Sequence, residues 1–401
     1  MSKNKVVVRS TLGDLKKFAS IVSTRKGIIE SASQSPLLRT YGVNETAKAL
    51  HPPVLHLIVK KVVPMGGGVK SFVLTNNLNK GTQALPYFKA GQYIGLSFKI
   101  GNSFVTRPYS IVSSPALALK NNEYIITVKP KYNGFASSYI LNNWRTGTAI
   151  DAVGPYGNFC YSPIRDEKTI LGVAGGSGVS PFISLAQAIA DGTEDVDLIL
   201  LYGCRKLSDA TFKPLLDELM QSCKRVKAVY VFSDEKVDKC ERGFVSRAII
   251  EKYAPERYSL FVCGPASLYR FIASEVSLMD IERKNIRFEV FDKTKNLGSF
   301  EEFIEEKEGK EFYLTVYKRG DIIAELKCHA DESILAALER GGVAAHSLCR
   351  SGECGFCRSK LTAGEVFIPK ETDKRRMADA KYNIIHPCCT YPASDVAIEI
   401  F

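Results

Sequence analysis

Hydrophobic and polar positions follow three different patterns along the chain after residue 53. Residues 54–162 carry short runs rich in β-branched and aromatic residues, each bounded by turn residues. These runs read VLHLIVKKVV, VKSFVLTN, QYIGLSFKI, RPYSIVSS and EYIITVKP. Strands this short and this regularly interrupted predict an antiparallel β-barrel.

Between residues 163 and 292, continuous apolar runs alternate with helix-like stretches. The apolar runs are TILGVAG, DVDLILLYGC, VKAVYVFS and YSLFVCGP. Strands that are apolar on both faces and separated by helices predict an α/β domain, with helices covering both faces of a parallel sheet.

Residues 293–311 are acidic and poor in apolar positions, which is typical of a solvated linker. Residues 312–401 then open with a hairpin pattern that turns at KRGD, followed by a helix pattern that stops at Gly341. This predicts a small α+β domain, so the chain is expected to be a multidomain protein. The linker would let this last domain move.

Residues 1–53 differ from the rest in charge. Apolar residues recur every three positions from Leu12 to Ile21, with Lys16 and Lys17 between them, which predicts a helix. We favour packing of this helix on its own protein over a membrane or partner helix. The segment carries nine Lys or Arg against three Asp or Glu, in a chain of net charge +11. No basic patch with interleaved aromatic residues accompanies it, so no nucleic-acid partner is expected.

The composition is that of an ordinary globular protein, with 45% hydrophobic and 24% charged residues. No apolar run is long enough for a transmembrane helix, and the N-terminus lacks the pattern of a signal peptide. A cytoplasmic protein is therefore expected. In that compartment, eleven cysteines indicate ligands or buried thiols rather than a disulfide framework.

Three cysteines lie close together in CRSGECGFC, at Cys349, Cys354 and Cys357, and HPCCTYP adds Cys388 and Cys389 about thirty residues later. Two irons need four thiolates, and Gly352 and Gly355 in the loop would let backbone N–H groups approach the sulfurs. Three other interpretations were weighed: a zinc site, a redox C-x2-C pair, and a Rieske centre using His346 and His386. The spacing favours a [2Fe–2S] cluster over all three.

This C-x4-C-x2-C spacing with a distant fourth cysteine resembles the plant-type ferredoxins over residues 312–401. The resemblance implies a β-grasp, ferredoxin-like fold. It also implies that Cys388 is the fourth ligand, because the family's C-x-x-Y-P pattern begins at the ligand. Phe356 departs from the family, where a small or hydroxyl residue is common, and could shield the cluster or alter its potential.

Four further motifs occur in order: RPYS at 107, GFASS at 134, GGSG at 175 and CGP at 263. Together they resemble the ferredoxin-NADP reductase superfamily over residues 54–291. The resemblance implies an FAD site and a nicotinamide-nucleotide site, with FAD favoured over FMN. The implied cofactor-binding residues are Arg107, Pro108, Tyr109, Ser110, Gly134, Ser137, Ser138, Gly175, Gly176, Gly178, Cys263, Gly264 and Pro265.

Within this set the resemblance implies catalytic roles for Ser110, near the reactive nitrogen of the flavin, and Cys263, beside the nicotinamide. Arg107 suits a phosphate because its guanidinium offers a bidentate fork. The alternatives are that Tyr109 is only a core aromatic and Cys263 only a buried thiol. The glycine loop fails the dinucleotide fingerprint because Pro181 stands where the last glycine would be.

The preferred nucleotide stays open. Arg205, Lys206 and Ser233 would suit the 2′-phosphate of NADPH, whereas Asp209 and Asp234 would suit a ribose hydroxyl.

The whole layout resembles the reductase components of oxygenases and the hybrid-cluster-protein reductase. It implies electron transfer from NADH or NADPH to FAD, to the [2Fe–2S] cluster, and to a protein acceptor such as an oxygenase or hydroxylase component. The alternative is a non-catalytic electron-transfer subunit or redox sensor with the same cofactors.

Overall fold

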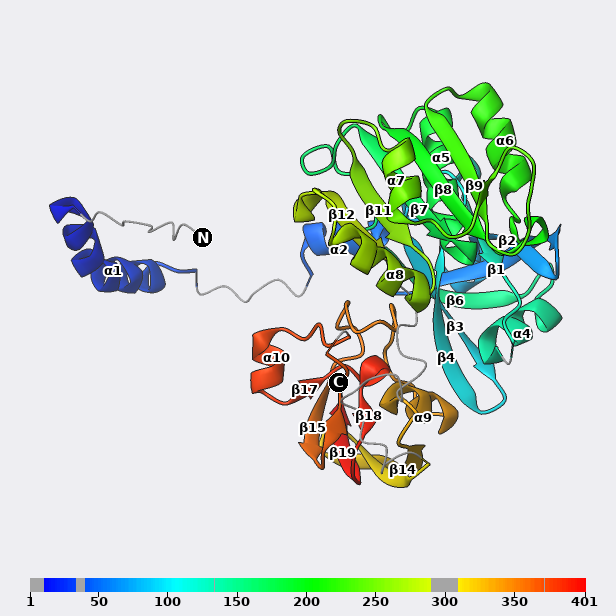
Figure 1. Cartoon of the computed structure of the whole chain (residues 1–401). Coiled ribbons are helices and arrows are strands. Elements are labelled where there is room, and N and C mark those ends of the chain that lie inside the picture. The colour runs from blue at the N-terminus through cyan, green and yellow to red at the C-terminus, as the bar shows by residue number, and fades with distance from the viewer. Residues whose placement is uncertain (1–10, 34–39, 133, 290–308, 371) are drawn as a thin grey trace. The chain divides into compact units, whose positions relative to one another are not determined.

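A computed structural model describes residues 11–33, 40–132, 134–289, 309–370 and 372–401 (Figure 1). The chain divides into two compact units, residues 1–50 and residues 51–401. Most of the predicted acidic linker, residues 293–308, lies outside the described residues. No helix in the described parts is both long and apolar enough to cross a membrane.

The first unit contains two helices, α1 (Leu12–Glu30) and α2 (Gly42–Leu50). Thr11 and Asp14 form a reciprocal capping box that explains where α1 begins. The predicted helix is therefore confirmed. The packing of this helix on its own protein stays a prediction.

The barrel predicted for residues 54–162 is confirmed as a six-stranded antiparallel sheet in the order β4-β3-β6-β1-β2-β5. The end strands β4 and β5 approach each other where the Val112 amide donates to the Ile125 carbonyl. Helices α3 (Pro115–Asn121) and α4 (Phe135–Asn143) accompany the sheet. Its strands are β1 (Leu55–Gly66), β2 (Val69–Asn76), β3 (Tyr93–Ile100), β4 (Ser103–Ser110), β5 (Glu123–Val128) and β6 (Ala149–Tyr156).

The parallel sheet predicted for residues 163–292 is also confirmed, with strand order β10-β9-β8-β7-β11-β12. Helices α5 and α6 pack on one face and α7 and α8 on the other (Figure 1). Its strands are β7 (Thr169–Gly175), β8 (Asp197–Cys204), β9 (Val226–Phe232), β10 (Glu241–Arg242), β11 (Ser259–Cys263) and β12 (Ile286–Glu289). Its helices are α5 (Ser180–Ala190), α6 (Lys213–Ser222), α7 (Arg247–Tyr253) and α8 (Ala266–Val276).

The C-terminal α+β domain is built on a five-stranded mixed sheet in the order β14-β13-β19-β15-β17. Helix α9 (Ile334–Arg340) buries Ile334 and Leu338 in the same core as Leu314, Val316 and Ile398 of the sheet. The other elements are β13 (Glu311–Lys318), β14 (Asp321–His329), β15 (Ser359–Ala363), β16 (Val366–Phe367), α10 (Met377–Lys381), β17 (Ile384–Ile385), η7 (Pro387–Cys389), β18 (Tyr391–Pro392) and β19 (Val396–Ile400).

Candidate functional site

The RPYS motif lies at the end of β4, paired with β3, where Tyr93 faces Ser110 and Ile94 faces Tyr109 across the ladder. The Tyr109 ring packs partly against the barrel core, and burial raises its pKa to about 12. Tyr109 is only partly buried, so the stacking role stays a prediction beside the alternative of a core aromatic.

The GFASS motif forms the N-terminus of α4. Gly134 is the N-cap, and a Cβ there would come within 2.3 Å of the Ser137 hydroxyl, so only glycine fits. No side chain caps the N-terminal amides of α4. Uncapped amides at a helix N-terminus suit an anion, and the exposed Ser138 lies in the same first turn.

The GGSG loop brings the carboxyl ends of β7 and β11 together. A Cβ on Gly178 would come within 2.2 Å of the Cys263 carbonyl oxygen, and one on Gly175 within 2.7 Å of a Leu268 methyl. These two glycines therefore allow the loop to pack closely against the end of β11 and against α8. Gly176, with φ +54° and open space beyond its Cα, is the glycine of this loop that leaves room for a ligand.

Cys263 ends β11 fully buried, directly beside Glu289 of the parallel strand β12. Burial holds the pKa of the Cys263 thiol well above its usual range, so the thiol is neutral at pH 7. Burial likewise raises the pKa of Glu289, with Glu353 and Cys349 of the cysteine loop contributing repulsion. Its Oε2 atom is buried and has no hydrogen-bond partner within the described residues.

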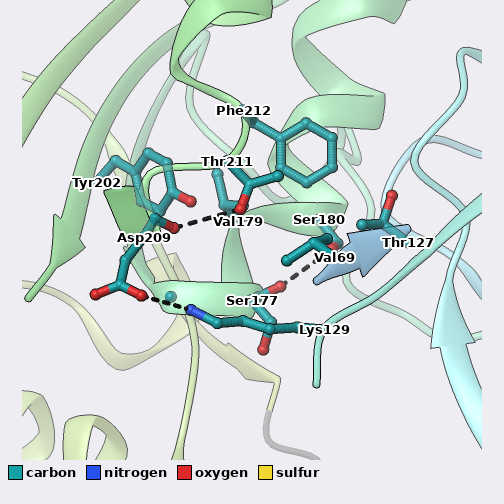
Figure 2. A pocket seen from close by; sticks show the side chains of 11 residues that line it. Val69, Thr127, Lys129, Ser177, Val179, Ser180, Tyr202, Asp209, Thr211 and Phe212 are labelled. Carbon is teal, nitrogen blue, oxygen red and sulfur yellow. Dashed lines mark hydrogen bonds and ion pairs between the residues drawn. The ribbon is translucent and has the colours of Figure 1, made fainter. Parts of the chain in front are cut away.

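A pocket opens between the barrel and the glycine loop (Figure 2). The Lys129 ammonium, from the barrel, lies 3.1 Å from the Asp209 carboxylate of the α/β domain. Gly176 and Ser180, at the start of α5, line the same pocket. The pocket thus joins a cation, a helix N-terminus and an open glycine, a combination that suits a dinucleotide phosphate.

The residues that might select the nucleotide lie near the ends of β8 and β9. Arg205 and Lys206 are exposed, whereas Asp209 is engaged by Lys129 and by the Lys206 amide. The Ser233 hydroxyl donates to Asp234. Both cationic and acidic groups are present, so the choice between NADH and NADPH stays open.

The predicted cluster ligands form two thiol pairs. Hydrogen bonding from Cys354 lowers the pKa of Cys349. Cys357 and Cys388 form the second hydrogen-bonded pair; the bond to Cys388 and burial raise the pKa of Cys357, and the pKa of Cys388 is raised as well. Two pairs of thiolates suit two irons. Among the described side chains, no three His, Cys, Asp or Glu groups converge as a single-ion site would require.

The loop also supplies backbone donors to the sulfurs. The Ser351 and Cys354 amides lie 3.5 and 3.4 Å from Cys349 Sγ, and the Phe356 amide lies 3.4 Å from Cys354 Sγ. Gly352 and Gly355 have φ of +79° and +66°, which explains the two glycines in the motif. The loop therefore fits a cluster whose sulfurs need N–H donors.

Neighbouring groups separate the cluster interpretation from its alternatives. Cys389 Sγ contacts the carbonyl oxygens of His386 and Thr372, at 3.4 and 3.7 Å, and is also a hydrogen-bonding neighbour of Cys388. His386 Nδ1 is held by the Gly352 carbonyl at 2.8 Å, and His346 packs its ring against Phe356. Neither histidine replaces a cysteine of the two pairs.

The cysteine loop packs directly on the barrel beside the RPYS motif. Cys349 and Leu348 share a small apolar cluster with Tyr93 and Val153 of the barrel. Arg107, predicted to bind phosphate, instead donates through Nη1 to both carboxylate oxygens of Glu339 on α9, at 2.9 and 3.0 Å. Burial lowers the pKa of Arg107, and the neighbouring Arg350 adds repulsion.

Sequence reasoning missed three residues: Lys129, Glu289 and Glu339. Each has at least one neighbour in another domain, and no local motif indicates such a contact. Of the three, only Glu289 could have been noticed in the sequence, because it is an acidic residue at the end of the short strand IRFE.

Comparisons with known proteins match three domain families to this chain. An oxidoreductase FAD-binding domain matches residues 56–161, an oxidoreductase NAD-binding domain residues 173–274, and a 2Fe-2S iron–sulfur cluster binding domain residues 320–393. These ranges fall on the barrel, the parallel sheet and the C-terminal domain.

Two curated relatives share this layout. The glycine betaine monooxygenase reductase subunit of Chromohalobacter salexigens is 26% identical over 329 residues, covering 78% of this chain and 87% of that protein. The carnitine monooxygenase reductase subunit of Escherichia coli is 27% identical over 310 residues, covering 77% and 86%. The structure of phthalate dioxygenase reductase aligns with a TM-score of 0.62 at 24% identity, covering 86% of this chain and 98% of that one.

Proposed function

The chain is a flavoprotein of the ferredoxin-NADP reductase type with a C-terminal [2Fe–2S] domain, and from this premise we propose that it serves as the reductase component of an oxygenase. It is an NAD(P)H-dependent oxidoreductase whose electrons pass through FAD and the cluster to a partner redox protein. An oxygenase acceptor is supported by the two relatives named as monooxygenase reductase subunits.

When bound, FAD accepts a hydride and releases its electrons singly, and the cluster carries one electron at a time. The chain supplies binding and orientation. The N-terminus of α4 and the free edge of Arg107 bind the flavin phosphates, Tyr109 orients the ring, and Ser110 donates a hydrogen bond near it. Gly176, Lys129 and the start of α5 hold the nucleotide diphosphate.

Cys263 closes the nicotinamide side of the site. Burial raises the pKa of its thiol, so Cys263 would be a small, neutral group beside the nicotinamide. Gly178 lets this residue approach the glycine loop. Cys349, Cys354, Cys357 and Cys388 are the residues that would hold a [2Fe–2S] cluster.

One observation carries the proposal: the cysteine loop lies against the flavin motif. Cys349 is in the apolar cluster of Tyr93, whose strand partner is Ser110. The residues that would hold the cluster and those that would hold the flavin ring therefore meet in one apolar contact, which suits electron transfer between the two groups. Cys354 is exposed and offers the outward side for transfer to the acceptor.

The test is an anaerobic titration of the purified, cofactor-loaded protein with NADH and, separately, NADPH. We expect bleaching of the flavin bands followed by the cluster bands, and the nucleotide that acts at lower concentration is the donor. Cofactor bands that neither nucleotide bleaches would overturn the enzyme and favour the non-catalytic subunit or sensor.

The oxygenase partner needs its own experiment. The reduced protein is mixed with purified Rieske-type oxygenases and, as a control, with cytochrome c as a generic protein acceptor. Turnover-linked reoxidation by one oxygenase at a rate well above that with cytochrome c supports the assignment. Equal rates with all acceptors would contradict it.

A further inference from the structure

Glu339 lies at the contact between the cluster domain and the flavin domain. It is on α9, and its side chain is only 6% exposed. Its carboxylate accepts from Arg107 of the flavin motif and, at 2.6 Å, from Arg350 next to the cluster ligand Cys349. The Thr106 amide of β4 lies 3.4 Å from the same carboxylate. One acidic group therefore joins the flavin motif to the cysteine loop.

The arrangement is electrostatically sensitive. Two guanidinium groups, 22% and 16% exposed, share one buried carboxylate. Removing that carboxylate would leave two like charges facing each other with little solvent between them. Losing one partner of a buried ion pair is strongly unfavourable because the other charge is left unpaired.

The apolar contact around this group is close but small. A Cβ on Gly95 of β3 would come within 2.7 Å of a Leu348 methyl, and the rings of Tyr156 and Phe356 lie 6.0 Å apart. Shape alone thus permits one tight fit of the cysteine loop on the barrel. The charged group adds a contact whose loss on either side would leave a buried charge unpaired.

We propose that Glu339 is the positioning residue that docks the [2Fe–2S] domain on the flavin domain for internal electron transfer. The inference rests on the proposed reductase function and adds the residue that controls its second step. Glu339 is not itself among the proposed cofactor-binding residues, but it contacts one of them, Arg107, and also Arg350 beside the cluster ligand Cys349. It acts by holding Arg107 and Arg350, and through them the flavin motif and the cysteine loop.

This role is compatible with phosphate binding by Arg107. Only Nη1 of Arg107 is engaged by Glu339 and the Thr106 carbonyl. The Nε and Nη2 edge has no hydrogen-bond partner within the described residues and remains available to an anion. Two cations beside one carboxylate leave an excess positive charge, which a flavin phosphate would neutralise.

The test uses the full chain with FAD and cluster bound, in which Glu339→Gln is compared with the wild type by anaerobic stopped-flow spectroscopy. At saturating nucleotide, the flavin bands should bleach at the wild-type rate. Bleaching of the cluster bands should be slower by about tenfold or more, as expected when a buried charge pair loses one member. Iron content and the electron paramagnetic resonance spectrum of the cluster should stay unchanged.

Two further variants complete the design. Glu339→Asp keeps the charge on a shorter side chain and should give an intermediate rate. Glu332→Gln is the control. It removes the carboxylate that pairs with Arg340 at the end of the same helix, and the rate of cluster reduction should equal that of the wild type.

Wild-type cluster reduction in both Glu339 variants would overturn the inference while leaving the reductase function intact. Wild-type flavin that no nucleotide bleaches would instead remove the function itself. If Glu339→Gln loses its cluster, the test uses Glu339→Asp instead. A wild-type rate of cluster reduction in Glu339→Asp would then contradict the docking role.

Discussion

The flavin barrel makes two interfaces of different kinds. Toward the nucleotide domain it shares one continuous core, in which Phe159 packs on Phe182 of α5 and on Phe261 of β11. The Ser184 hydroxyl and the Gln187 amide of α5 donate to barrel carbonyl oxygens at 2.7 and 2.6 Å. This interface combines a shared apolar core with direct hydrogen bonds.

Toward the cluster domain the barrel offers Arg107, which pairs with the shared carboxylate of Glu339, and a small apolar patch. This difference between the two interfaces corresponds to the two steps of the proposed function, hydride transfer and single-electron transfer. Hydride transfer needs two rings in fixed contact, so a permanent core suits it. Single-electron transfer to a separate acceptor protein needs a domain that docks on the flavin and then exposes its cluster. A weaker, charge-dependent contact suits that role.

Removing the cluster should have the largest effect. Cys357→Ser breaks one thiol pair, so we expect the cluster bands and transfer to protein acceptors to be lost. Flavin bleaching by NAD(P)H should stay within about twofold, because the nucleotide interface is untouched. Cys389→Ser is the matched control and should keep both the iron and the activity. Loss of iron in the control alone would make Cys389 the ligand.

Breaking the permanent interface should be the next largest effect. Arg287 of β12 donates to two carbonyl oxygens at the end of the barrel and to the fully buried carboxylate of Asp166, at 2.7 and 2.9 Å. Asp166→Ala should therefore lower the free energy of unfolding by about 3–5 kcal/mol, measured by denaturant titration. Asp195→Ala, at an exposed pair, should leave that free energy nearly unchanged.

Cys263→Ala tests the hydride step within that interface. The substitution opens space beside the nicotinamide, and misplacement of reacting groups should slow flavin bleaching by about 10- to 100-fold. The measurement is stopped-flow at saturating nucleotide. Because burial holds the thiol neutral, the wild-type rate should show no titration of this group between about pH 6 and 8. An unchanged rate in the variant would support the alternative of an inert buried thiol.

Lys129→Ala should have the smallest effect. The ammonium is partly exposed and paired with Asp209, so its loss should raise the KM for NAD(P)H by roughly 3- to 10-fold with little change in kcat. Steady-state reduction of an artificial acceptor measures both. Lys80→Ala, on an exposed turn of the barrel, provides the control. A fall in kcat with constant KM would place Lys129 outside the nucleotide site.

The sequence predicted the features that depend on neighbouring residues. Strands such as β7 and β11 are continuous apolar runs, and the cysteine loop needs its glycines at fixed spacing, so each was found from local pattern. Strand β6 was missed because Gly154 and Pro155 interrupt its apolar alternation. Strand β12 was also missed, because it has only four residues. Helix α8 was missed because the CGP motif before it was interpreted only as part of a nucleotide site.

The site was predictable to the same extent. The four motifs identified which elements would bind cofactors, since each motif is contiguous in sequence. The partner of Arg107 was not predictable, because Glu339 lies more than two hundred residues away and on another domain. Gly175 and Gly178 were assigned to ligand approach, whereas their space is filled by Leu268 and Cys263, which only the packed structure reveals.

Hydrogen–deuterium exchange on the wild type and on Glu339→Gln tests the comparison of the two interfaces most directly. Peptides covering Val112 and Ser113 report on the nucleotide interface, and peptides covering residues 104–107 and 339–350 report on the cluster interface. We predict slow exchange of the first set in both proteins, and faster exchange of the second set that increases further in the variant. Equal protection of both interfaces, unchanged by the substitution, would contradict a cluster domain that docks reversibly through Glu339.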